Sequence, residues 1–279
     1  MWLVDKPAGP TSHDIVARIR HGLERGVRVG HAGTLDPFAT GLLVVVVGRA
    51  TRLAQYFTGL DKTYLARIRL GATSPSGDPE GPITVTSARV PDAAEVEGAV
   101  ARLVGAQRQR VPALAAVKVG GEALYARTRR GEQVERPERD IMIHAARVVA
   151  GDREDATVDI EIRCSKGTYI RQLAADLGEA LGCGGYCETL RRTAVGSLRI
   201  EQALAPGSVA AAGGIDPRIA LADVLDVRTL TPAEAIDVGH GRAVAGDAAR
   251  AVMLVADDRL VAIAEPRGDG TLRPKVVLT

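Results

Sequence analysis

The chain has 279 residues, of which 46% are hydrophobic, 25% charged and only 3% aromatic, and its formal net charge is +2. This composition is typical of a globular protein with an aliphatic core that needs neither disulfides nor metal ions for stability. The longest apolar run, 42–47, is too short to span a bilayer. Because 36 basic residues face 34 acidic ones, a nucleic-acid partner would have to be bound by locally concentrated positive charge.

Residues 1–82 predict short strands alternating with short helices. We expect a strand over 2–4, a helix capped by Thr11 or Ser12, a loop over 30–41, a fully buried strand over 42–47 and a short helix over 51–57. Residues 62–70 alternate between apolar and polar side chains, which indicates a strand. Residues 74–82 are rich in Gly, Pro and Asp, which indicates a loop.

The rest of the chain predicts further helices and strands and a small C-terminal domain. We expect a helix that begins at a capping box of Asp92 and Glu95, a strand over 158–164, and an amphipathic helix over 168–181. After a Gly-, Pro- and Ala-rich break at 203–215, a helix is expected over 232–238 and strands over 252–255, 260–264 and 275–278. The predicted fold class is therefore α+β, with a mixed, largely antiparallel body over 1–226 and a small β-rich domain over 227–279.

The segment GHAGTLDPFATG, residues 30–41, is the strongest candidate for a functional loop. It lies between a predicted amphipathic helix and a buried strand, where rigid structure on both sides could position a side chain. Pro37 favours an extended backbone at Asp36, which limits the directions in which the carboxylate points. The residues alone leave two interpretations open, a catalytic carboxylate or a turn held by an Asx hydrogen bond.

A second candidate is CSKGTYIR, residues 164–171, at a predicted strand-to-helix junction. Lys166, Arg171 and the backbone amides after Gly167 could together bind a phosphate or carboxylate, although the spacing is not that of a phosphate-binding P-loop. Arg171 could equally be a solvated helix residue. Tyr64, on the predicted strand 62–70, could be half-buried packing.

Other signals are weaker. The five histidines lack metal-ligand spacing, and no dinucleotide-binding fingerprint is found. The odd number of cysteines, Cys164, Cys183 and Cys187, argues against a disulfide scaffold, so we expect free thiols in a reducing cytoplasm. The Arg-rich segment 127–139 predicts either a loop that follows an RNA backbone or a solvated surface excursion.

Taken together, these segments resemble the TruB family of tRNA pseudouridine-55 synthases. The similar pieces occur in family order: LVDKPAGPTSHD, GHAGTLDPFATGLL, DKTYLARIRLG, PALAAVKVGGEALYARTRRG, CSKGTYIRQLAADLG and ETLRRTAVG. They span residues 2–200, and the C-terminal domain is similar to the PUA-like appendage of bacterial members. The resemblance implies isomerisation of uridine 55 in the T-loop of tRNA to pseudouridine by base flipping, with no metal and no cofactor.

The resemblance also implies a catalytic set of Asp36, Tyr64 and Arg171. Asp36 matches the catalytic aspartate, and Arg171 matches the arginine that pairs with it and keeps it ionised and aimed. Tyr64 matches the tyrosine that stacks on the target base and is proposed to assist proton removal. Family resemblance favours a glycal route with proton removal from the sugar, while the residues leave attack on the sugar carbon or on the base ring open.

The predicted substrate-binding set is His31, Leu190, Lys6 and Lys166. His31 matches the histidine that enters the T-loop stack as the target leaves it, and Leu190 matches the apolar residue beside the base pocket. Lys6 belongs to the motif that braces the catalytic loop. The segment 73–81 and the residue type near Ala115 depart from the family pattern, and neither is expected to touch the catalytic set.

The expected partner is the T-arm of tRNA, bound by a cytoplasmic monomer with no obligatory protein partner and no membrane contact. Two other functions fit the same residues. One is a guide-RNA-dependent pseudouridine synthase with the same Asp36 chemistry, which the short C-terminal domain argues against. The other is a tRNA-folding chaperone in which catalysis is secondary, which the set of Asp36, Tyr64 and Arg171 argues against.

Overall fold

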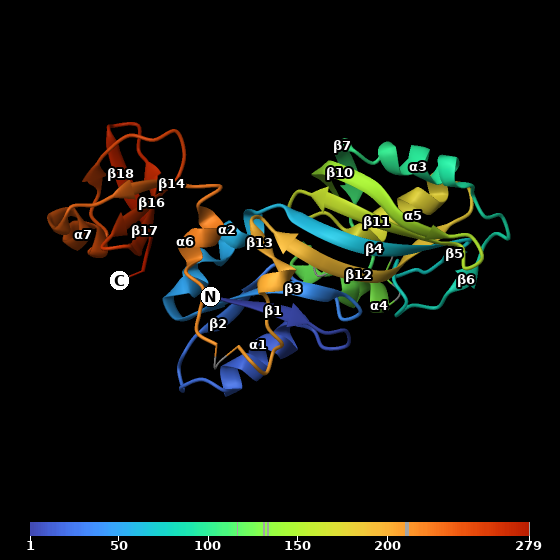
Figure 1. Cartoon of the computed structure of the whole chain (residues 1–279), viewed down its shortest axis with the longest axis horizontal. Coiled ribbons are helices and arrows are strands. Elements are labelled where there is room, and N and C mark those ends of the chain that lie inside the picture. Colours follow the sequence, from blue (N-terminus) through green and yellow to red (C-terminus); the bar gives the residue numbers. More distant parts are fainter. Residues whose placement is uncertain (116, 131, 133, 210–211, 279) are drawn as a thin grey trace.

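The computed structural model describes residues 1–115, 117–130, 132, 134–209 and 212–278. Figure 1 shows a larger body, which contains the N-terminus, beside a smaller C-terminal part coloured red. Within the described residues the body is built on a nine-stranded sheet in the order β1-β3-β12-β4-β11-β10-β7, with β2 beside β3 and β13 beside β12. Its strands are β1 (Trp2–Lys6), β2 (Val29–Ala32), β3 (Thr40–Val47), β4 (Lys62–Leu70), β7 (Gly105–Arg110), β10 (Glu138–Asp152), β11 (Thr157–Cys164), β12 (Gly185–Val195) and β13 (Leu198–Arg199).

Strand pairing in this sheet is largely antiparallel, as expected for the α+β class. The exception is the junction of β3 with β12, which pair in parallel at Thr40 and Gly41. Gly41 has φ of +101°, and a Cβ atom there would lie 2.3 Å from the carbonyl oxygen of Arg192 on β12. Only glycine permits this close approach, which brings the loop before β3 against the strand that carries Leu190.

Helices cover both faces of the sheet. On one face α1 (Ser12–His21), α3 (Ala93–Ala101) and α5 (Ile170–Ala180) bury a core with the alternate side chains of β4 and β11. On the other face η1 (Gly48–Leu53), α2 (Ala54–Gly59) and α6 (Pro217–Leu221) bury a second core. Leu43 and Val45 of β3 join the first core and Leu42 and Val44 the second, which explains the uninterrupted apolar sequence of this strand.

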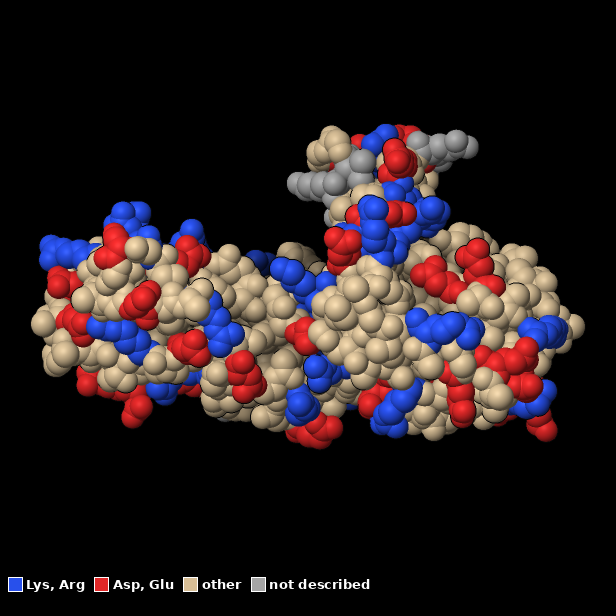
Figure 2. Space-filling model, turned by 90° about the horizontal axis from the view of Figure 1, so that it is seen from above, with Lys and Arg blue, Asp and Glu red and all other residues tan. Residues whose placement is uncertain are grey.

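The remaining short elements lie at the edges of the body. They are β5 (Ala72–Thr73) paired with β6 (Thr84–Val85), β8 (Lys118–Val119) paired with β9 (Glu122–Ala123), α4 (Leu124–Arg129) and η2 (Ile200–Gln202). The segment with β8, β9 and α4 projects from the body as a knob in Figure 2.

The C-terminal part is a five-stranded sheet in the order β14-β16-β17-β18-β15, flanked by α7 (Pro232–Gly239). Its strands are β14 (Asp226–Thr229), β15 (Val244–Ala245), β16 (Val252–Ala256), β17 (Arg259–Pro266) and β18 (Thr271–Val277). Met253 and Ile263 of this sheet lie in one core cluster with Leu3 and Phe57 of the body. The boundary placed between 226 and 227 falls inside β14, and the division into two domains stays a prediction.

Several predicted elements are confirmed. The strand over 62–70 has the predicted bounds, the buried strand over 42–47 is extended by two residues, and the three C-terminal strands are all present. The capping box of Asp92 and Glu95 begins α3. The three cysteines are free and buried, as expected.

Two expectations about local structure were wrong, and one predicted helix is present but begins two residues later than expected. The loop predicted over 30–41 is shorter, because β2 pairs with β3 and leaves only 33–39 without strand structure. The helix predicted from Thr168 begins at Ile170, with Tyr169 in an extended conformation before it. The Arg-rich segment 127–139 is not a single loop, because its ends belong to α4 and β10, and its residues 131 and 133 lie outside the described part.

Charge is mixed on the face shown in Figure 2, where Lys and Arg side chains alternate with Asp and Glu over both parts of the molecule. A near-neutral protein needs a concentration of positive charge on one face to bind nucleic acid, and the face in Figure 2 shows none. Among the described helices, none has the length and apolar character needed to cross a membrane.

Candidate active site

Asp36 lies in the loop 33–39, whose backbone is held by buried side chains from two other elements. Arg192 on β12, only 1% exposed, donates from Nη2 and Nη1 to the carbonyls of the first two loop residues, at 2.9 and 3.4 Å. Ser12 at the start of α1 donates from Oγ to the carbonyl of Leu35 at 3.0 Å and accepts from its amide at 2.9 Å. Because unpaired buried backbone groups are costly, these contacts favour a single loop conformation.

The second half of the loop is held by Lys6 at the end of β1. Lys6 is fully buried, and its Nζ donates to the carbonyls of Pro7, Pro10 and Pro37 at 2.9, 2.8 and 3.2 Å. The amide of Gly9 also donates to the Pro37 carbonyl, at 2.9 Å. Burial lowers the pKa of Lys6, while the nearby charge of Asp36 acts in the opposite direction. The ammonium group thus contacts the catalytic loop directly and is covered by protein.

Arg171, in the first turn of α5, joins Asp36 to a second carboxylate. Its Nε lies 2.9 Å from Oδ2 of Asp36, and its Nη1 lies 3.1 Å from Oδ2 of Asp78. The side chains of Arg171 and Asp78 are 5% and 4% exposed, whereas that of Asp36 is 37% exposed. Nη1 and Nη2 also donate to the carbonyls of Ser76 and Leu114, at 2.7 and 3.1 Å.

These contacts hold the guanidinium group independently of Asp36. The Nε–H of Arg171 makes no hydrogen bond within the described residues despite the short Nε–Oδ2 distance. The contact with Asp36 is therefore an ion pair without a well-aligned hydrogen bond from Nε. Asp36 is attracted to a fixed positive charge and still presents its carboxylate to the space in front of it.

That space is a cavity of about 370 Å³, which brings together four of the predicted residues, Asp36, Tyr64, Arg171 and Leu190. The other lining residues come from the loop 33–39, α2, β4, β10, β12, the start of α5 and the segments that precede β8 and α5: Gly33, Thr34, Leu35, Thr58, Lys62, Ala115, Val117, Arg139, Ser165, Gly167, Thr168, Tyr169, Ile170 and Arg192. The volume lies in the range of small-ligand sites. The cavity has an apolar wall at Leu190, an aromatic ring at Tyr64 and a carboxylate at Asp36.

Tyr64 is buried beneath this cavity and its neighbour on the same strand face is Lys62. Burial raises the pKa of Tyr64, so its hydroxyl is protonated at neutral pH. Lys62 is 6% exposed and donates to the carbonyls of Thr58 and Leu60. Burial, with a smaller contribution from the charge of Arg192, lowers the pKa of Lys62 to about 8.

Tyr169 and Arg139 form the rim of the cavity on the side of the knob. The guanidinium carbon of Arg139 lies 5.0 Å from the centre of the Tyr169 ring, in a cation–π contact. Gln109 fixes the backbone of Tyr169 by donating to its carbonyl at 3.0 Å and accepting from its amide at 2.8 Å. A planar, positively charged group on an aromatic ring is suited to contact a base or a phosphate.

The other predicted substrate-binding residues lie outside the cavity lining. His31 is half-buried on β2, its Nδ1 is buried without a hydrogen-bond partner among the described residues, and burial lowers its pKa. Lys6 lies beneath the loop, as described above. Lys166 is exposed. The anion site proposed from Lys166, Arg171 and the amides after Gly167 does not form, because Arg171 and the Tyr169 amide have protein partners.

The expectation that 73–81 would not touch the predicted catalytic set was wrong. Asp78 is bonded to Arg171, and Ala115 lines the cavity. A usable signal for Asp78 was its Asp–Pro sequence in a Gly-rich loop, the same context as Asp36. Lys62 could have been found by the period-two alternation that places it on the same strand face as Tyr64. No local signal marks Arg192.

Comparisons with known proteins agree with this architecture. The solved "Structure of H/ACA RNP bound to a substrate RNA containing 2'-deoxyuridine" has a chain that superposes with a TM-score of 0.73, at 22% identity, over 100% of this chain and 84% of that one. Residues 20–170 match the model of the "TruB family pseudouridylate synthase (N terminal domain)", and 171–214 match the "tRNA pseudouridylate synthase B C-terminal domain". The protein is thus a pseudouridine synthase, an isomerase, as the sequence resemblance implied.

Curated relatives identify the family more narrowly. A protein of Thermobifida fusca (strain YX) named tRNA pseudouridine synthase B is 44% identical over 99% of this chain and 97% of its own length. A protein of the same name from Synechococcus sp. (strain WH7803) is 44% identical over 99% of this chain and 96% of its own length. The chain belongs to the TruB family.

Proposed function

We propose that this protein converts uridine 55 in the T-loop of tRNA to pseudouridine, with Asp36 as the nucleophile. The observation that carries the proposal is a partly exposed carboxylate, 2.9 Å from a buried arginine, at a cavity lined by Tyr64 and Leu190. The name shared by relatives that are 44% identical over 99% of the chain supports tRNA as the substrate.

The reaction breaks the N-glycosidic bond of uridine, turns the base and joins its C5 to the same sugar carbon. No group is lost and nothing is oxidised, so the reaction calls for a group that assists bond cleavage, a site that retains the detached base and a proton acceptor. Asp36 would supply the first. Tyr64 and Leu190 would hold the base between an aromatic ring and an apolar wall.

The target nucleotide must leave its stack, at a cost of a few kcal/mol. A cavity of about 370 Å³ could hold one flipped nucleoside, and stacking on an aromatic ring offsets roughly 1–3 kcal/mol per base. His31, beside the loop on β2, would take the place of the flipped base in the T-loop. Arg139 and Tyr169 at the rim would contact the neighbouring backbone.

Family resemblance favours a glycal route over attack on the sugar carbon or on the base ring. In that route the Asp36 carboxylate would accept a proton from C2′ of the sugar as the N-glycosidic bond breaks and would return it as C1′ joins C5 of the base, which in turn passes its C5 proton to solvent while N1 is protonated. The Tyr64 hydroxyl, which is protonated at neutral pH, could stabilise charge on the detached base by donating a hydrogen bond. Arg171 would hold a positive charge 2.9 Å from Asp36, and Asp78 would balance the remaining charge of the guanidinium group.

The test is pseudouridine formation by the purified protein alone on an unmodified tRNA transcript, mapped by position. The proposal predicts one product, at position 55, and none on a matched transcript with cytidine there. Product that appears only when a guide RNA is added would support the guide-dependent alternative. Binding and refolding of tRNA without any product would support the chaperone alternative.

A further inference from the structure

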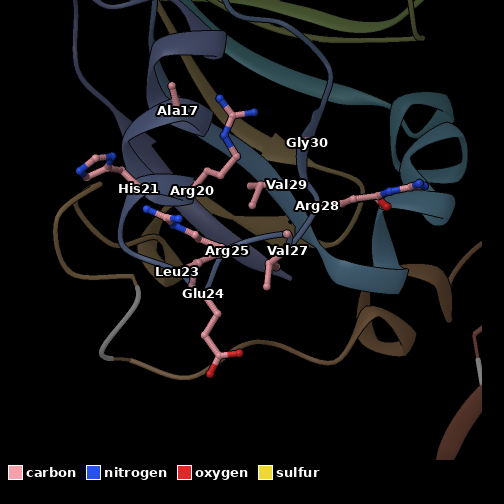
Figure 3. Close-up of a pocket in the computed structure, with 12 residues that line it drawn as sticks. Ala17, Arg20, His21, Leu23, Glu24, Arg25, Val27, Arg28, Val29 and Gly30 are labelled. Atoms are coloured by element: carbon pink, nitrogen blue, oxygen red, sulfur yellow. The ribbon is translucent and has the colours of Figure 1, made fainter.

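A second and larger cavity, of about 850 Å³, lies at the end of α1 and the start of β2. It is lined by Ala17, Arg20, His21, Leu23, Glu24, Arg25, Gly26, Val27, Arg28, Val29, Gly30 and Thr51. None of these residues lines the catalytic cavity. Figure 3 shows its lining side chains, and the Glu24 carboxylate points away from Arg20 and Arg25.

The positive charge in this cavity is not neutralised by the protein. Arg20, Arg25 and Arg28 are exposed, and within the described residues none of them makes a salt bridge or a side-chain hydrogen bond. Three guanidinium groups against one carboxylate leave a local charge of +2, equal to the formal net charge of the whole chain. By contrast, Arg67 and Arg147 on the main sheet are both paired with carboxylates.

The end of α1 explains only part of this cluster. Arg20 and His21 lie in its last turn, where a positive charge is favoured by the helix dipole. Arg25 and Arg28 follow the helix, beyond the range of that effect. Figure 3 shows the three guanidinium groups extending in different directions around this hollow. Exposed guanidinium groups that line one hollow and have no carboxylate partner among the described residues are suited to binding several phosphates of one backbone.

The second cavity is next to the catalytic one. Gly30 on β2 lines the second cavity, and Gly33, just after β2, lines the catalytic cavity. Three residues of extended chain separate these two points, which is at most about 10 Å. The backbone points at which the two cavities are lined are therefore close together, and we take one RNA backbone to contact both.

We propose that the cavity formed by Arg20, Arg25 and Arg28 binds phosphate groups of the RNA substrate outside the flipped nucleotide. The inference rests on the proposed function, because it takes tRNA as the ligand. The cavity supplies the concentrated positive charge that the near-neutral chain lacks on the face shown in Figure 2. It anchors the RNA backbone and takes no part in the chemical step.

The experiment compares the triple variant R20Q/R25Q/R28Q with the control R102Q/R153Q/R273Q, in the full chain. The control removes the same charge at exposed arginines that line neither cavity. Equilibrium binding of unmodified tRNA is measured from 50 to 300 mM salt, with kcat and KM for pseudouridine formation in parallel. Thermal unfolding of both variants verifies that they fold.

For the cavity variant, the slope of log K against log salt should fall by about 2 to 3 and Kd at 0.1 M salt should rise at least about tenfold. KM should rise by a similar factor while kcat changes less than about twofold, and the control should bind like the wild type. Equal losses in both variants, or no loss in the cavity variant, would overturn the inference. Wild-type protein that binds tRNA through this cavity but forms no pseudouridine would refute the proposed function instead.

Discussion

Removing the charge of Asp78 should impair catalysis although this residue does not line the catalytic cavity. Oδ2 of Asp78 accepts from Nη1 of Arg171, while Oδ1 accepts from Oγ of Ser76 at 2.6 Å and from the amide of Glu80 at 3.1 Å. In Asp78→Asn the single oxygen satisfies Ser76 and Glu80 only if the new amide group faces Arg171. Two donors then oppose each other, and the guanidinium group retains Asp36 as its sole carboxylate partner.

The expected magnitude follows from the burial of this pair. Breaking a buried ion pair costs about 3–5 kcal/mol, and we expect the lower end because Asp36 still balances part of the charge. A lost charge-assisted hydrogen bond is worth about 1.5–3 kcal/mol. If the loss of this hydrogen bond displaces Arg171 from Asp36 and the same energy is added to the activation barrier, kcat should fall about 10- to 100-fold. Affinity for tRNA should change little, because Asp78 is 3% exposed.

The assay is single-turnover pseudouridine formation together with urea unfolding and tRNA binding. Asp159→Asn is the matched control, because Asp159 makes a two-bond contact with Arg67 on the exposed face of the sheet. Loss of this exposed ion pair should lower the free energy of unfolding by at most about 1 kcal/mol. The Asp159→Asn substitution should leave kcat unchanged. An Asp78→Asn variant with the rate and the stability of the wild type would refute the argument that Asp78 fixes Arg171.

Further predictions concern the residues that hold the site. Ser12→Ala leaves the amide and carbonyl of Leu35 without their partner, so the free energy of unfolding should fall by about 2–4 kcal/mol in urea; wild-type stability would contradict this. Gly41→Ala should lower the free energy of unfolding by at least about 2 kcal/mol, because Gly41 has a positive φ and its Cβ would meet the backbone of Arg192. Gly48→Ala is the control in the same thermal unfolding assay, and it should be less destabilised because Gly48 has φ of +59° and open space around it. Between pH 8 and 10.5 the unfolded chain holds a proton on Lys62 that the folded protein has lost, since its pKa falls from 10.5 to about 8. The free energy of unfolding should therefore rise across this window by up to about 3 kcal/mol relative to Lys62→Met, and parallel pH profiles would contradict the assignment.

The elements with a clear hydrophobic period were predictable from the sequence. β4 has the predicted bounds because Tyr64, Ala66 and Ile68 alternate with polar residues and face one core. β3 was predicted as buried on both faces because its apolar run has no polar interruption. The loop that carries Asp36 was predicted from its position between a helix and a buried strand, but with bounds too wide at both ends.

Elements whose environment is set by distant residues were missed. β7 is the last strand of the sheet and β10 lies beside it, and most of their side chains are partly or fully exposed, so their sequences show no sustained apolar alternation. β2 contains Gly30 and His31 and was taken for a loop, because its pairing with β3 depends on backbone hydrogen bonds. Asp78 and Arg171 are 93 residues apart, so no local pattern could reveal that the arginine is buried between two carboxylates.

The central claim is that Asp36 is the nucleophile, and Asp36→Asn tests it most directly. This change keeps the size of the side chain, and the loop should be preserved because its backbone is held by Ser12, Lys6 and Arg192. We expect wild-type protein to form pseudouridine at position 55 of an unmodified tRNA transcript. Asp36→Asn should bind the same transcript and give no product. Product formed by Asp36→Asn at a rate near that of the wild type would contradict the account.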